Sequence, residues 1–417
     1  MQESIKRDLF KRVLTNDSPW EQLLNRRNLA VFSGEAFDFT ASLSAEILAQ
    51  PNIRTYPELV ALAFWLRRAN IQKIASLNVF DNDAMLVPLA RGLVLHIAPS
   101  NVDTIFVYSW VLSLLCGNRN ILRVPSRPSV QISILLNCID TVLSMSQSRA
   151  LRERVSFLRY DASDDATAIL SQSVDVRVIW GGDETVNRIR RIPLKPTAID
   201  LSFPNKWSLS VVSYGYWKNL TLEEKKKLAR FFAFDAYQFG QAACSSPRCV
   251  IWLAEEAGPV EVDLFWELVS QSLTDVTFQF SAVDYVNKLV ASDLLSQKGL
   301  INTVPSSDNR ILRLKIKPEQ LGRIVEEVHQ CDAGFFFEFQ TNTLADVFTG
   351  LGRNIQTVSS AGVSSKVWKD TLMNDQLNCF DRIVPIGMSL DFSPVWDGFK
   401  LLSEFVRFVD LTKLEGN

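Results

Sequence analysis

Apolar positions follow two different patterns along the chain, and the pattern changes near residue 90. Before this point they recur at helical spacing, and Leu59, Leu62 and Leu66 form one face of such a helix. Residues 55–58, Thr-Tyr-Pro-Glu, come before that helix and have the sequence of a capping box begun by Thr55. Pro57 falls in the first turn, where its missing N–H costs little. The sequence therefore predicts a largely helical N-terminal segment.

From residue 92 to about 190, short apolar runs alternate with helix-length segments. Strands are predicted at residues 93–97, 120–124, 155–158 and 176–180, and helices at 104–116, 129–145, 164–170 and 183–190. This alternation predicts an α/β fold with a doubly wound parallel sheet of the Rossmann type. Such sheets bind ligands at the carboxyl ends of their strands, which here are residues 98–101, 125–127 and 181–183.

A second α/β region is predicted to begin near Pro204. It opens with a strand at 209–213 and a helix at 221–239, which Thr221 and Glu224 cap. Further strands are predicted at 249–254, 311–316, 334–340 and 355–358, helices at 260–273 and 282–296, and a last helix at 398–409. We therefore expect one domain over residues 1–204 and a second over 205–379. The turn-rich C-terminal segment, 380–417, is expected to pack back on the first.

The composition is that of a globular protein, with 47% hydrophobic and 22% charged residues. The 44 basic and 46 acidic side chains give a net charge of −2, so charge supplies no reason to expect a nucleic acid or an anionic membrane surface as partner. No run reaches the roughly 18 apolar residues of a membrane span. The charged N-terminus lacks the apolar core of a signal peptide, so we expect a cytoplasmic protein without a membrane span.

Cysteine and histidine usage narrows the chemistry further. The six cysteines are scattered without a CxxC pair, which does not fit a disulfide framework. There are two histidines, so a histidine-based triad or metal site must use His96 or His329. His329 has Cys331 beside it but no further ligand nearby, and His96 lies in an apolar strand. We therefore expect no metal site.

The strongest signal for chemistry is residues 239–248, FGQAACSSPR. This segment places Cys244 among small residues, after a long helix and before an apolar strand, which leaves the thiol accessible. Nearby backbone N–H groups can stabilise a thiolate and an oxyanion, and Arg248 adds positive charge. The spacing alone leaves two interpretations, which are a nucleophile and a buried free cysteine, the usual state of this residue in proteins.

Three ordered motifs connect this loop to a known superfamily. GQAAC at 240–244, followed by Arg248, resembles the nucleophile loop of aldehyde dehydrogenases, and LVLHIAPSN at 93–101 and CGNRNILRVPS at 116–126 resemble two upstream motifs. QAACSSPR and the block DRIVPIGMSLDFSPVWDG at 381–398 resemble the LuxC-type acyl-CoA reductase branch. The resemblance spans roughly Thr55 to the C-terminus. It implies an aldehyde-dehydrogenase-like fold in which residues 1–204 bind a nicotinamide cofactor and 205–379 carry the nucleophile.

The resemblance implies that the Cys244 thiolate attacks an acyl thioester, displaces CoA and forms a thioacyl-enzyme that is then reduced to the aldehyde. Asn101 matches the oxyanion asparagine of the superfamily, although asparagine also suits a turn after a strand. Hydrolysing relatives use a glutamate as the base for water. Ser202 stands there if Lys206 aligns without a gap, and Asp200 if a gap is allowed. The missing glutamate fits a reductase that keeps water from its thioester.

The same resemblance implies cofactor contacts around Ser126. Many relatives carry a glutamate after this Pro-Ser pair, which holds the adenosine ribose. Here Arg127 stands there, and Arg123 lies just before. Because a cation can pair with a 2′-phosphate, NADPH is favoured over NADH, and the alternative is that both arginines lie on a solvated loop. The motif's lysine falls on Val124, so that contact depends on Arg123.

Two further cofactor contacts are open to a second interpretation. Gly181 and Gly182 suit the close approach of a phosphate or the nicotinamide to a helix N-terminus, but a plain turn explains them equally. Glu338 matches the glutamate that orients the nicotinamide ribose, and the alternative is a surface-facing strand position. The sequence contains neither GxGxxG nor a P-loop, and the superfamily binds its dinucleotide without the former.

Several functional alternatives remain at this point. A CoA-acylating aldehyde dehydrogenase would run the same chemistry in reverse, and a cysteine acyltransferase or thioesterase would use Cys244 without a hydride. A non-catalytic subunit of a multienzyme complex would leave the pairing of Cys244 with Asn101 unexplained. By resemblance to LuxC-type reductases, we expect an acyl-CoA or acyl-thioester substrate, an acyl-activating ligase of the LuxE type as partner, and a homo-oligomer.

Overall fold

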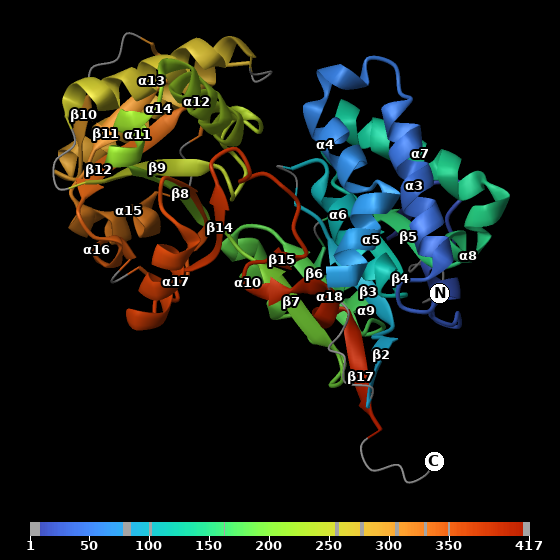
Figure 1. The fold of residues 1–417 in the computed structure, drawn as a ribbon. Coiled ribbons are helices and arrows are strands. Elements are labelled where there is room, and N and C mark those ends of the chain that lie inside the picture. Colours follow the sequence, from blue (N-terminus) through green and yellow to red (C-terminus); the bar gives the residue numbers. More distant parts are fainter. Residues whose placement is uncertain are drawn as a thin grey trace. The chain divides into compact units, whose positions relative to one another are not determined.

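The chain folds into two compact α/β units. The structure, a computed structural model, describes residues 9–77, 85–99, 102–161, 163–254, 258–275, 279–304, 308–328, 332–348 and 351–411. The first unit comprises Met1–Pro204 and Phe392–Asn417, and the second comprises Asn205–Asp391 (Figure 1). The chain thus returns to the first unit at Phe392 and not at residue 380. The reason is that β14 (Phe380–Pro385), in the stretch predicted to be turns, is a strand of the second unit's sheet.

The first unit contains the predicted doubly wound sheet. Its strand order is β1-β5-β4-β3-β6-β7, with β1 antiparallel to β5 and the other five strands parallel. The strands are β1 (Lys11–Arg12), β5 (Val155–Arg159), β4 (Arg119–Arg123), β3 (Leu93–Ile97), β6 (Val176–Trp180) and β7 (Ile199–Phe203). Central strands that are buried on both faces read as continuous apolar runs, which explains why the sequence located them well. The strand β7, with its polar Asp200 and Ser202, was missed.

Helices cover both faces of this sheet (Figure 1). One layer contains α3 (Gly34–Leu48), α4 (Pro57–Trp65), α5 (Arg68–Leu77), α6 (Ile105–Leu115), α7 (Val130–Ser144), α8 (Arg149–Arg152) and α18 (Leu401–Glu404). The other contains α2 (Trp20–Leu23), α9 (Asp164–Ser171) and α10 (Asp183–Arg190). The side chains of Ser129 and Ser163 cap α7 and α9 by accepting a backbone N–H, so each helix begins directly after a sheet strand and its turn.

Two predictions for the first unit are wrong. The tetrapeptide at 55–58 forms no capping box, because Thr55 belongs to the 3-10 turn η1 (Ile53–Thr55) and Tyr56 is the N-cap of α4 without a side-chain bond. Pro57 does occupy the first turn, as predicted. The last helix is the single turn α18, after which β17 (Val406–Asp410) pairs antiparallel with β2 (Leu86–Ala90). Its β-branched valines suit this ladder better than a helix.

The second unit is built on a seven-stranded sheet with the order β10-β11-β12-β9-β8-β13-β14. The strand β10 is antiparallel and the others are parallel. The strands are β10 (Asn302–Val304), β11 (Leu312–Lys315), β12 (Phe335–Thr341), β9 (Pro247–Leu253), β8 (Trp207–Ser213), β13 (Ile355–Ala361) and the edge strand β14. Since β8, β9, β12 and β13 are parallel neighbours, the loops that lead into them meet at one edge of the sheet.

Helices also cover both faces of the second sheet. One layer contains α11 (Tyr214–Asn219), α12 (Leu222–Tyr237) and α13 (Pro259–Ser272). The opposite layer contains α14 (Ala282–Gln297), α15 (Leu321–Glu327), α16 (Leu344–Phe348) and α17 (Ser365–Asn374). The predicted capping box of α12 is present, because Glu224 N–H donates to Thr221 Oγ1 at 3.4 Å and Thr221 N–H donates to Glu224 Oε2 at 2.9 Å.

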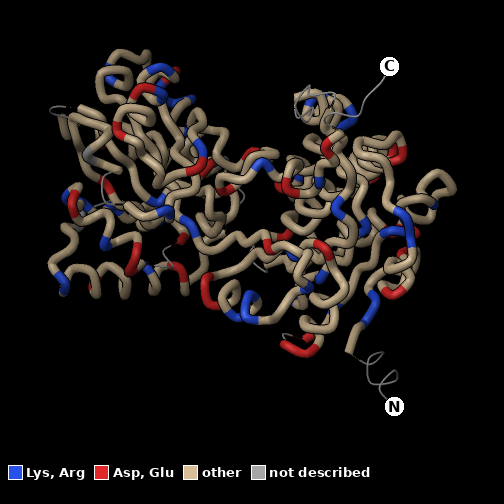
Figure 2. Tube along the Cα trace, turned by 90° about the horizontal axis from the view of Figure 1, so that it is seen from below, with Lys and Arg blue, Asp and Glu red and all other residues tan. Residues whose placement is uncertain are grey.

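Charged residues are spread over both units. Figure 2 shows Lys and Arg interspersed with Asp and Glu along the traced chain. Within the described residues, no helix combines the length and the apolar character needed to cross a membrane.

Candidate active site

Cys244 lies in the loop between α12 and β9, at the amino-terminal edge of the second sheet. The loop precedes Pro247, which begins β9, and the neighbouring strands β8 and β12 begin at the same edge. Cys244 is half-buried, whereas Cys116, Cys138, Cys249 and Cys379 are buried. Burial raises the pKa of Cys116, Cys138, Cys249 and Cys379, which makes them poor nucleophiles. Of the cysteines in the described ranges, Cys244 is therefore the one suited to react with a substrate.

Gln241 holds this loop in one conformation. Its side chain is fully buried, and its Nε2 donates to the carbonyl oxygens of Pro247 at 2.9 Å and Phe335 at 3.1 Å. Its Oε1 accepts from the N–H groups of Gly334 at 2.9 Å and Phe335 at 3.0 Å. Gln241 and the preceding Gly240 both have positive φ, of 66° and 58°. The four hydrogen bonds compensate for that strained backbone and fix the loop to β9 and β12.

The carbonyl group of Cys244 is also fixed. Ser208 Oγ donates to the Cys244 carbonyl oxygen at 2.7 Å and accepts from the Thr357 N–H at 3.1 Å. Ser208 belongs to β8 and Thr357 to β13, so two strands of the sheet set the orientation of the peptide that follows the thiol. Ser208 was not among the residues predicted to belong to the site. Its signal was a small polar side chain in a buried apolar strand.

Arg248 does not simply place a free charge near the thiol. Its guanidinium lies over the Trp207 ring, with Cζ at 5.5 Å from the ring centroid, and NH2 is 3.4 Å from Asp332 Oδ1. Burial raises the pKa of Asp332, and Arg248 counteracts that effect. The Nε of Arg248 is buried and has no hydrogen-bond partner among the described residues. The arginine thus fills the space between β8 and the turn that precedes β12.

The first part of the C-terminal block secures the same edge of the second sheet. Asp381 pairs with Lys206 at the start of β8, and both side chains are buried. Arg353 NH2 lies 3.5 Å from the other carboxylate oxygen of Asp381. Arg382 donates from Nε to Thr357 Oγ1 at 3.3 Å. The family resemblance of this block therefore coincides with contacts to the strands that flank the cysteine loop.

The second part of the C-terminal block is hydrogen-bonded to a buried carboxylate on α12. Asp235 accepts the N–H groups of Gly387 at 2.6 Å and Ser389 at 3.1 Å, and the Ser389 hydroxyl at 2.9 Å. Burial raises the pKa of Asp235 to about 6, although these three donors act to lower it. Arg382 donates to the carbonyls of Ser389 and Asp391. Sequence reasoning missed Asp235, whose signal was an acidic residue on an apolar helix face.

The predicted cofactor residues of the first unit lie at the carboxyl edge of its sheet. Arg123 ends β4, and its Cζ lies 5.0 Å from the centroid of the Tyr160 ring. The Nε of Arg123 is buried and lacks a hydrogen-bond partner among the described residues. Ser126 and Arg127 are exposed, and Arg127 NH2 lies 3.1 Å from Asp103 Oδ1. Arg123 Nε is therefore an unused donor at this edge, whereas Arg127 is already paired with a carboxylate.

Gly181 and Gly182 form the turn between β6 and α10. A Cβ at Gly181 would lie 3.2 Å from Thr185 Cγ2, closer than side chains normally approach. Gly182 is the N-cap of α10 and makes no side-chain cap, so the first N–H groups of this helix are not satisfied by a capping side chain. Packing against Thr185 therefore accounts for the glycine at 181, whereas the uncapped first turn of α10 leaves backbone N–H groups for a ligand, beside the acidic residues Asp183 and Glu184.

Glu338 is buried, which excludes the surface-facing position and leaves the cofactor contact as a prediction. It lies on β12 with a side chain only 3% exposed, and its Oε1 accepts from the indoles of Trp252 at 2.8 Å and Trp266 at 2.9 Å. Its Oε2 accepts from Arg313 Nε at 3.1 Å and NH2 at 2.8 Å. Both oxygens are therefore occupied by buried protein donors. We infer that Glu338 has a structural role in the second unit.

The two candidates for the missing base also have distinct surroundings. Asp200 on β7 forms a bidentate pair with the buried Arg177, at 2.7 and 2.8 Å. Ser202 lies on the same strand, and its Oγ is buried without a hydrogen-bond partner among the described residues. Asp200 is thus committed to Arg177, which disfavours it as a base for water. The neutral hydroxyl of Ser202 is too weak a base to take a proton from water.

The remaining candidates are either structural or cannot be located. His96 is buried between Ser109 Oγ, at 2.7 Å from Nδ1, and Asn120 Oδ1, at 3.0 Å from Nε2, and burial lowers its pKa to about 4. Asn101 and the His329–Cys331 segment lie outside the described residues. Across the described ranges, no group of three His, Cys, Asp or Glu side chains is arranged to hold a metal ion.

Solved structures of aldehyde dehydrogenases share this fold. A NAD-dependent aldehyde dehydrogenase from Sinorhizobium meliloti has a TM-score of 0.63 at 13% identity, over 93% of this chain and 84% of that chain. Lactaldehyde dehydrogenase from Escherichia coli has a TM-score of 0.61 at 12% identity, over 90% of this chain and 85% of that chain. A NAD-dependent benzaldehyde dehydrogenase from Corynebacterium glutamicum has a TM-score of 0.59 at 12% identity, over 90% of this chain and 85% of that chain. At such identities the likeness establishes the fold alone.

Sequence comparison gives the family. No functionally curated protein sequence matches the chain. The profile described as acyl-CoA reductase (LuxC) matches residues 68–408, which is most of the chain and includes the cysteine loop, the β3 and β4 motifs and the C-terminal block. The chain therefore belongs to the LuxC acyl-CoA reductase family, whose general reaction is the reduction of an acyl-CoA to an aldehyde.

Proposed function

We propose that the chain reduces an acyl-CoA, or another acyl thioester, to the aldehyde with NADPH, through a covalent thioacyl intermediate on Cys244. One observation carries the proposal. Cys244 is a half-buried cysteine in a loop held at Gln241 and Ser208, whereas Cys116, Cys138, Cys249 and Cys379 are buried. A nucleophile must be accurately placed without being fully buried, and these observations support that role for Cys244.

In the proposed first step, the Cys244 thiolate attacks the thioester carbonyl carbon. A bond forms between that carbon and Sγ, the bond from the carbon to the CoA sulfur breaks, and CoA leaves as a thiolate that takes up a proton. The carbonyl oxygen carries negative charge in between, and the Cys244 backbone N–H and the Asn101 side chain are the proposed donors to it. One such donor typically contributes a factor of about 10²–10³ to the rate.

In the second step the thioacyl carbon is reduced. A bound nicotinamide cofactor supplies the hydride for this reduction. The bond from the carbon to Sγ then breaks, so Cys244 is regenerated as a thiolate and the aldehyde is released. The chain's own contribution is to hold the thioester in place and to offer no strong base to water. The commitment of Asp200 to Arg177 and the serine at position 202 support that part of the proposal.

We propose that Arg123, Ser126, Arg127, Gly181 and Gly182 hold the dinucleotide. The fit rests on the unpartnered Nε of Arg123, the exposed guanidinium of Arg127 and the N-terminus of α10, which has no side-chain cap. Two guanidinium groups near the end of β4 favour a ligand with an additional phosphate. We therefore propose NADPH as the preferred cofactor over NADH.

The proposal is tested by following NADPH absorbance with a panel of acyl-CoAs. We expect the wild type and Cys379→Ala, a matched variant of a buried thiol, to consume NADPH and release aldehyde, and Cys244→Ala to do neither. CoA release by the wild type without NADPH consumption would instead identify an acyltransferase or thioesterase. Substitution of NADH for NADPH tests the cofactor preference. Co-purification tests two further proposals, an acyl-activating ligase of the LuxE type as partner and a homo-oligomer.

A further inference from the structure

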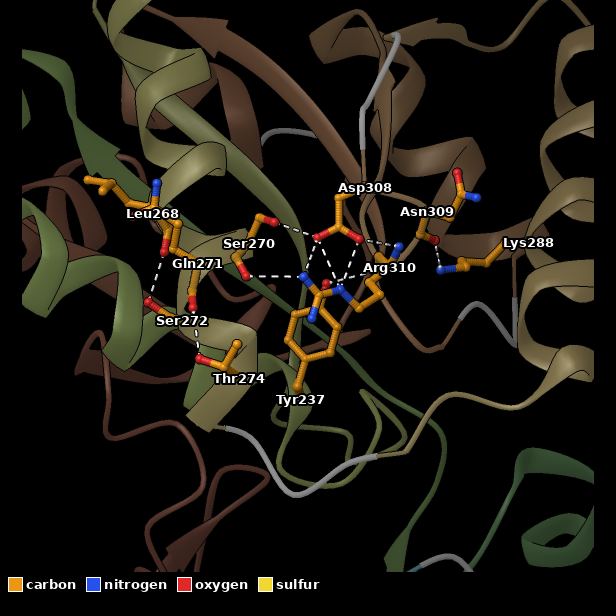
Figure 3. Close-up of polar contacts among 10 residues, drawn as sticks. All are labelled: Tyr237, Leu268, Ser270, Gln271, Ser272, Thr274, Lys288, Asp308, Asn309 and Arg310. Carbon is orange, nitrogen blue, oxygen red and sulfur yellow. Dashed lines mark hydrogen bonds and ion pairs between the residues drawn. The ribbon is translucent and has the colours of Figure 1, made fainter.

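A buried lysine supports the turn that precedes β12. Lys288, on α14, is only 4% exposed, and its Nζ donates to the carbonyl oxygens of Asn309 and Ala333, each at 2.8 Å. Figure 3 shows its bond to Asn309. The faces of Phe280 and Tyr285 lie 5.5 and 5.0 Å from the same nitrogen. The ammonium group is thus directed at backbone oxygens and ring faces.

The turn that Lys288 holds is hydrogen-bonded to the cysteine loop. Ala333 has a φ of 58°, which is unusual for a residue with a Cβ, and its N–H donates to the Gly240 carbonyl at 2.9 Å. Gly334 follows with a φ of 87°, and its N–H donates to Gln241 Oε1. A side chain at Gly334 would collide with the Arg310 carbonyl. Lys288 therefore connects to Gly240 and Gln241 through two residues with positive φ, of which Ala333 is the strained one.

Burying the charged Lys288 side chain at this position costs free energy. Burial lowers the pKa of Lys288 to about 8, which shows that the surroundings disfavour its charge. An apolar side chain of similar volume would avoid that desolvation cost, and buried charges are often neutral or unfavourable for stability. What the ammonium group adds is direction, because its two charge-assisted hydrogen bonds fix the Asn309 and Ala333 carbonyls relative to α14.

We propose that Lys288 is a positioning residue for the nucleophile: through Ala333 and Gly334 it sets the conformation of Gly240 and Gln241, and hence the placement of Cys244. The inference rests on the proposed function, in which Cys244 attacks the thioester. It goes beyond that function because it assigns a reaction-specific role to a residue that does not touch the thiol loop directly. A lysine that merely stabilised the fold would leave the reactivity of Cys244 unchanged.

The test compares Lys288→Met with the control Lys298→Met. Lys298 follows α14, is half exposed and pairs with Glu327. For each purified full-length variant, kcat and KM are measured together with the rate of Cys244 alkylation by iodoacetamide against pH, read by peptide mass spectrometry. We expect Lys288→Met to lower kcat about tenfold, since two charge-assisted bonds are lost. KM for the dinucleotide should not change, and the rate of Cys244 alkylation across the pH range should differ from that of the wild type. Lys298→Met should match the wild type.

A second variant keeps the test informative if Lys288→Met does not fold. Lys288→Gln retains an N–H donor for one carbonyl, and we expect a smaller change in the same direction, with Lys288→Arg closer to wild type. A folded Met or Gln variant with the wild-type kcat and alkylation profile would overturn the proposal. Cys244→Ser separates it from the proposed function. If that variant still reduces acyl-CoA, Cys244 is not the nucleophile, yet the alkylation profiles still report whether Lys288 sets the loop.

Discussion

The cysteine loop of the second unit (residues 239–248) and the arginine turn of the first unit (residues 124–127, after β4) differ in how firmly they are held. The cysteine loop is fixed by the four hydrogen bonds of Gln241 and by Ser208. The arginine turn leaves Arg127 with a 56% exposed side chain and one ion pair. Bond-making requires a fixed geometry, whereas recognition of a phosphate tolerates mobile cations. The comparison suggests that substitutions in the loop affect stability and kcat together, and substitutions in the turn affect cofactor affinity alone.

Removal of the Gln241 side chain should give the largest effect. Gln241→Ala removes four hydrogen bonds to buried backbone groups, so we expect the free energy of unfolding to fall by about 4 kcal/mol, at about 1 kcal/mol for each lost bond. Urea denaturation measures this change. Gln238→Ala, at the C-cap of α12 just before this loop, is the control and should cost much less. Equal losses in the two variants would mean that Gln241 does not hold the loop.

Asp235 should make the stability of the second unit depend on pH. Its pKa in the folded state is about 6, above the usual 3.8, so between pH 4 and 6 the folded state binds more protons than the unfolded state. Its contribution to the free energy of unfolding therefore declines as pH rises through that window, by at most about 3 kcal/mol. The difference between wild type and Asp235→Asn, measured by denaturation from pH 4 to 7, should fall accordingly. A constant difference would contradict the assignment.

Substitution of Glu338 tests whether this residue stabilises the second unit or contacts the cofactor. Glu338→Gln replaces two accepting oxygens by one and weakens the bonds from Trp252, Trp266 and Arg313. We expect a loss of about 2 kcal/mol in the free energy of unfolding. KM for NADPH should stay at its wild-type value. A large rise in KM in a variant of unchanged stability would support the prediction that Glu338 contacts the cofactor.

The smallest expected effect is on cofactor choice. Arg127→Glu should raise KM for NADPH about tenfold, which corresponds to about 1.4 kcal/mol, because a carboxylate repels the 2′-phosphate. KM for NADH, which lacks that phosphate, should change little, and the thermal midpoint should be unaffected because Arg127 is exposed. Steady-state kinetics with both cofactors gives the answer. Equal changes for NADPH and NADH would show that Arg127 does not read the phosphate.

The sequence predicted the fold where apolar runs stand between clear turns. The strands at residues 93–97 and 176–180 and the helix at 183–190 have the predicted bounds. The errors occur where tertiary pairing decides. The segment 406–410 has helical spacing from Leu401 onward, but it pairs with β2, a strand more than 300 positions earlier. No local pattern contains that information.

The candidate site divides in the same way. The position of Cys244 in a small-residue loop could be predicted, because the residues that form this motif are consecutive in the sequence. Ser208, Asp235 and Lys288 could not, since each acts on a backbone group from another part of the chain. Glu338 looked like a ligand contact because a charge on an apolar strand is unusual. The sequence could not show that two tryptophans and an arginine would surround it.

Trapping the acyl-enzyme tests the proposed mechanism most directly. The full-length protein is mixed with an acyl-CoA without NADPH, quenched in acid and digested, and the peptides are weighed by mass spectrometry. We expect one acyl group, bound as a hydroxylamine-labile thioester on the peptide that contains Cys244, and none in Cys244→Ser. Aldehyde formation in the presence of NADPH, without any acyl group on Cys244 in its absence, would contradict this mechanism.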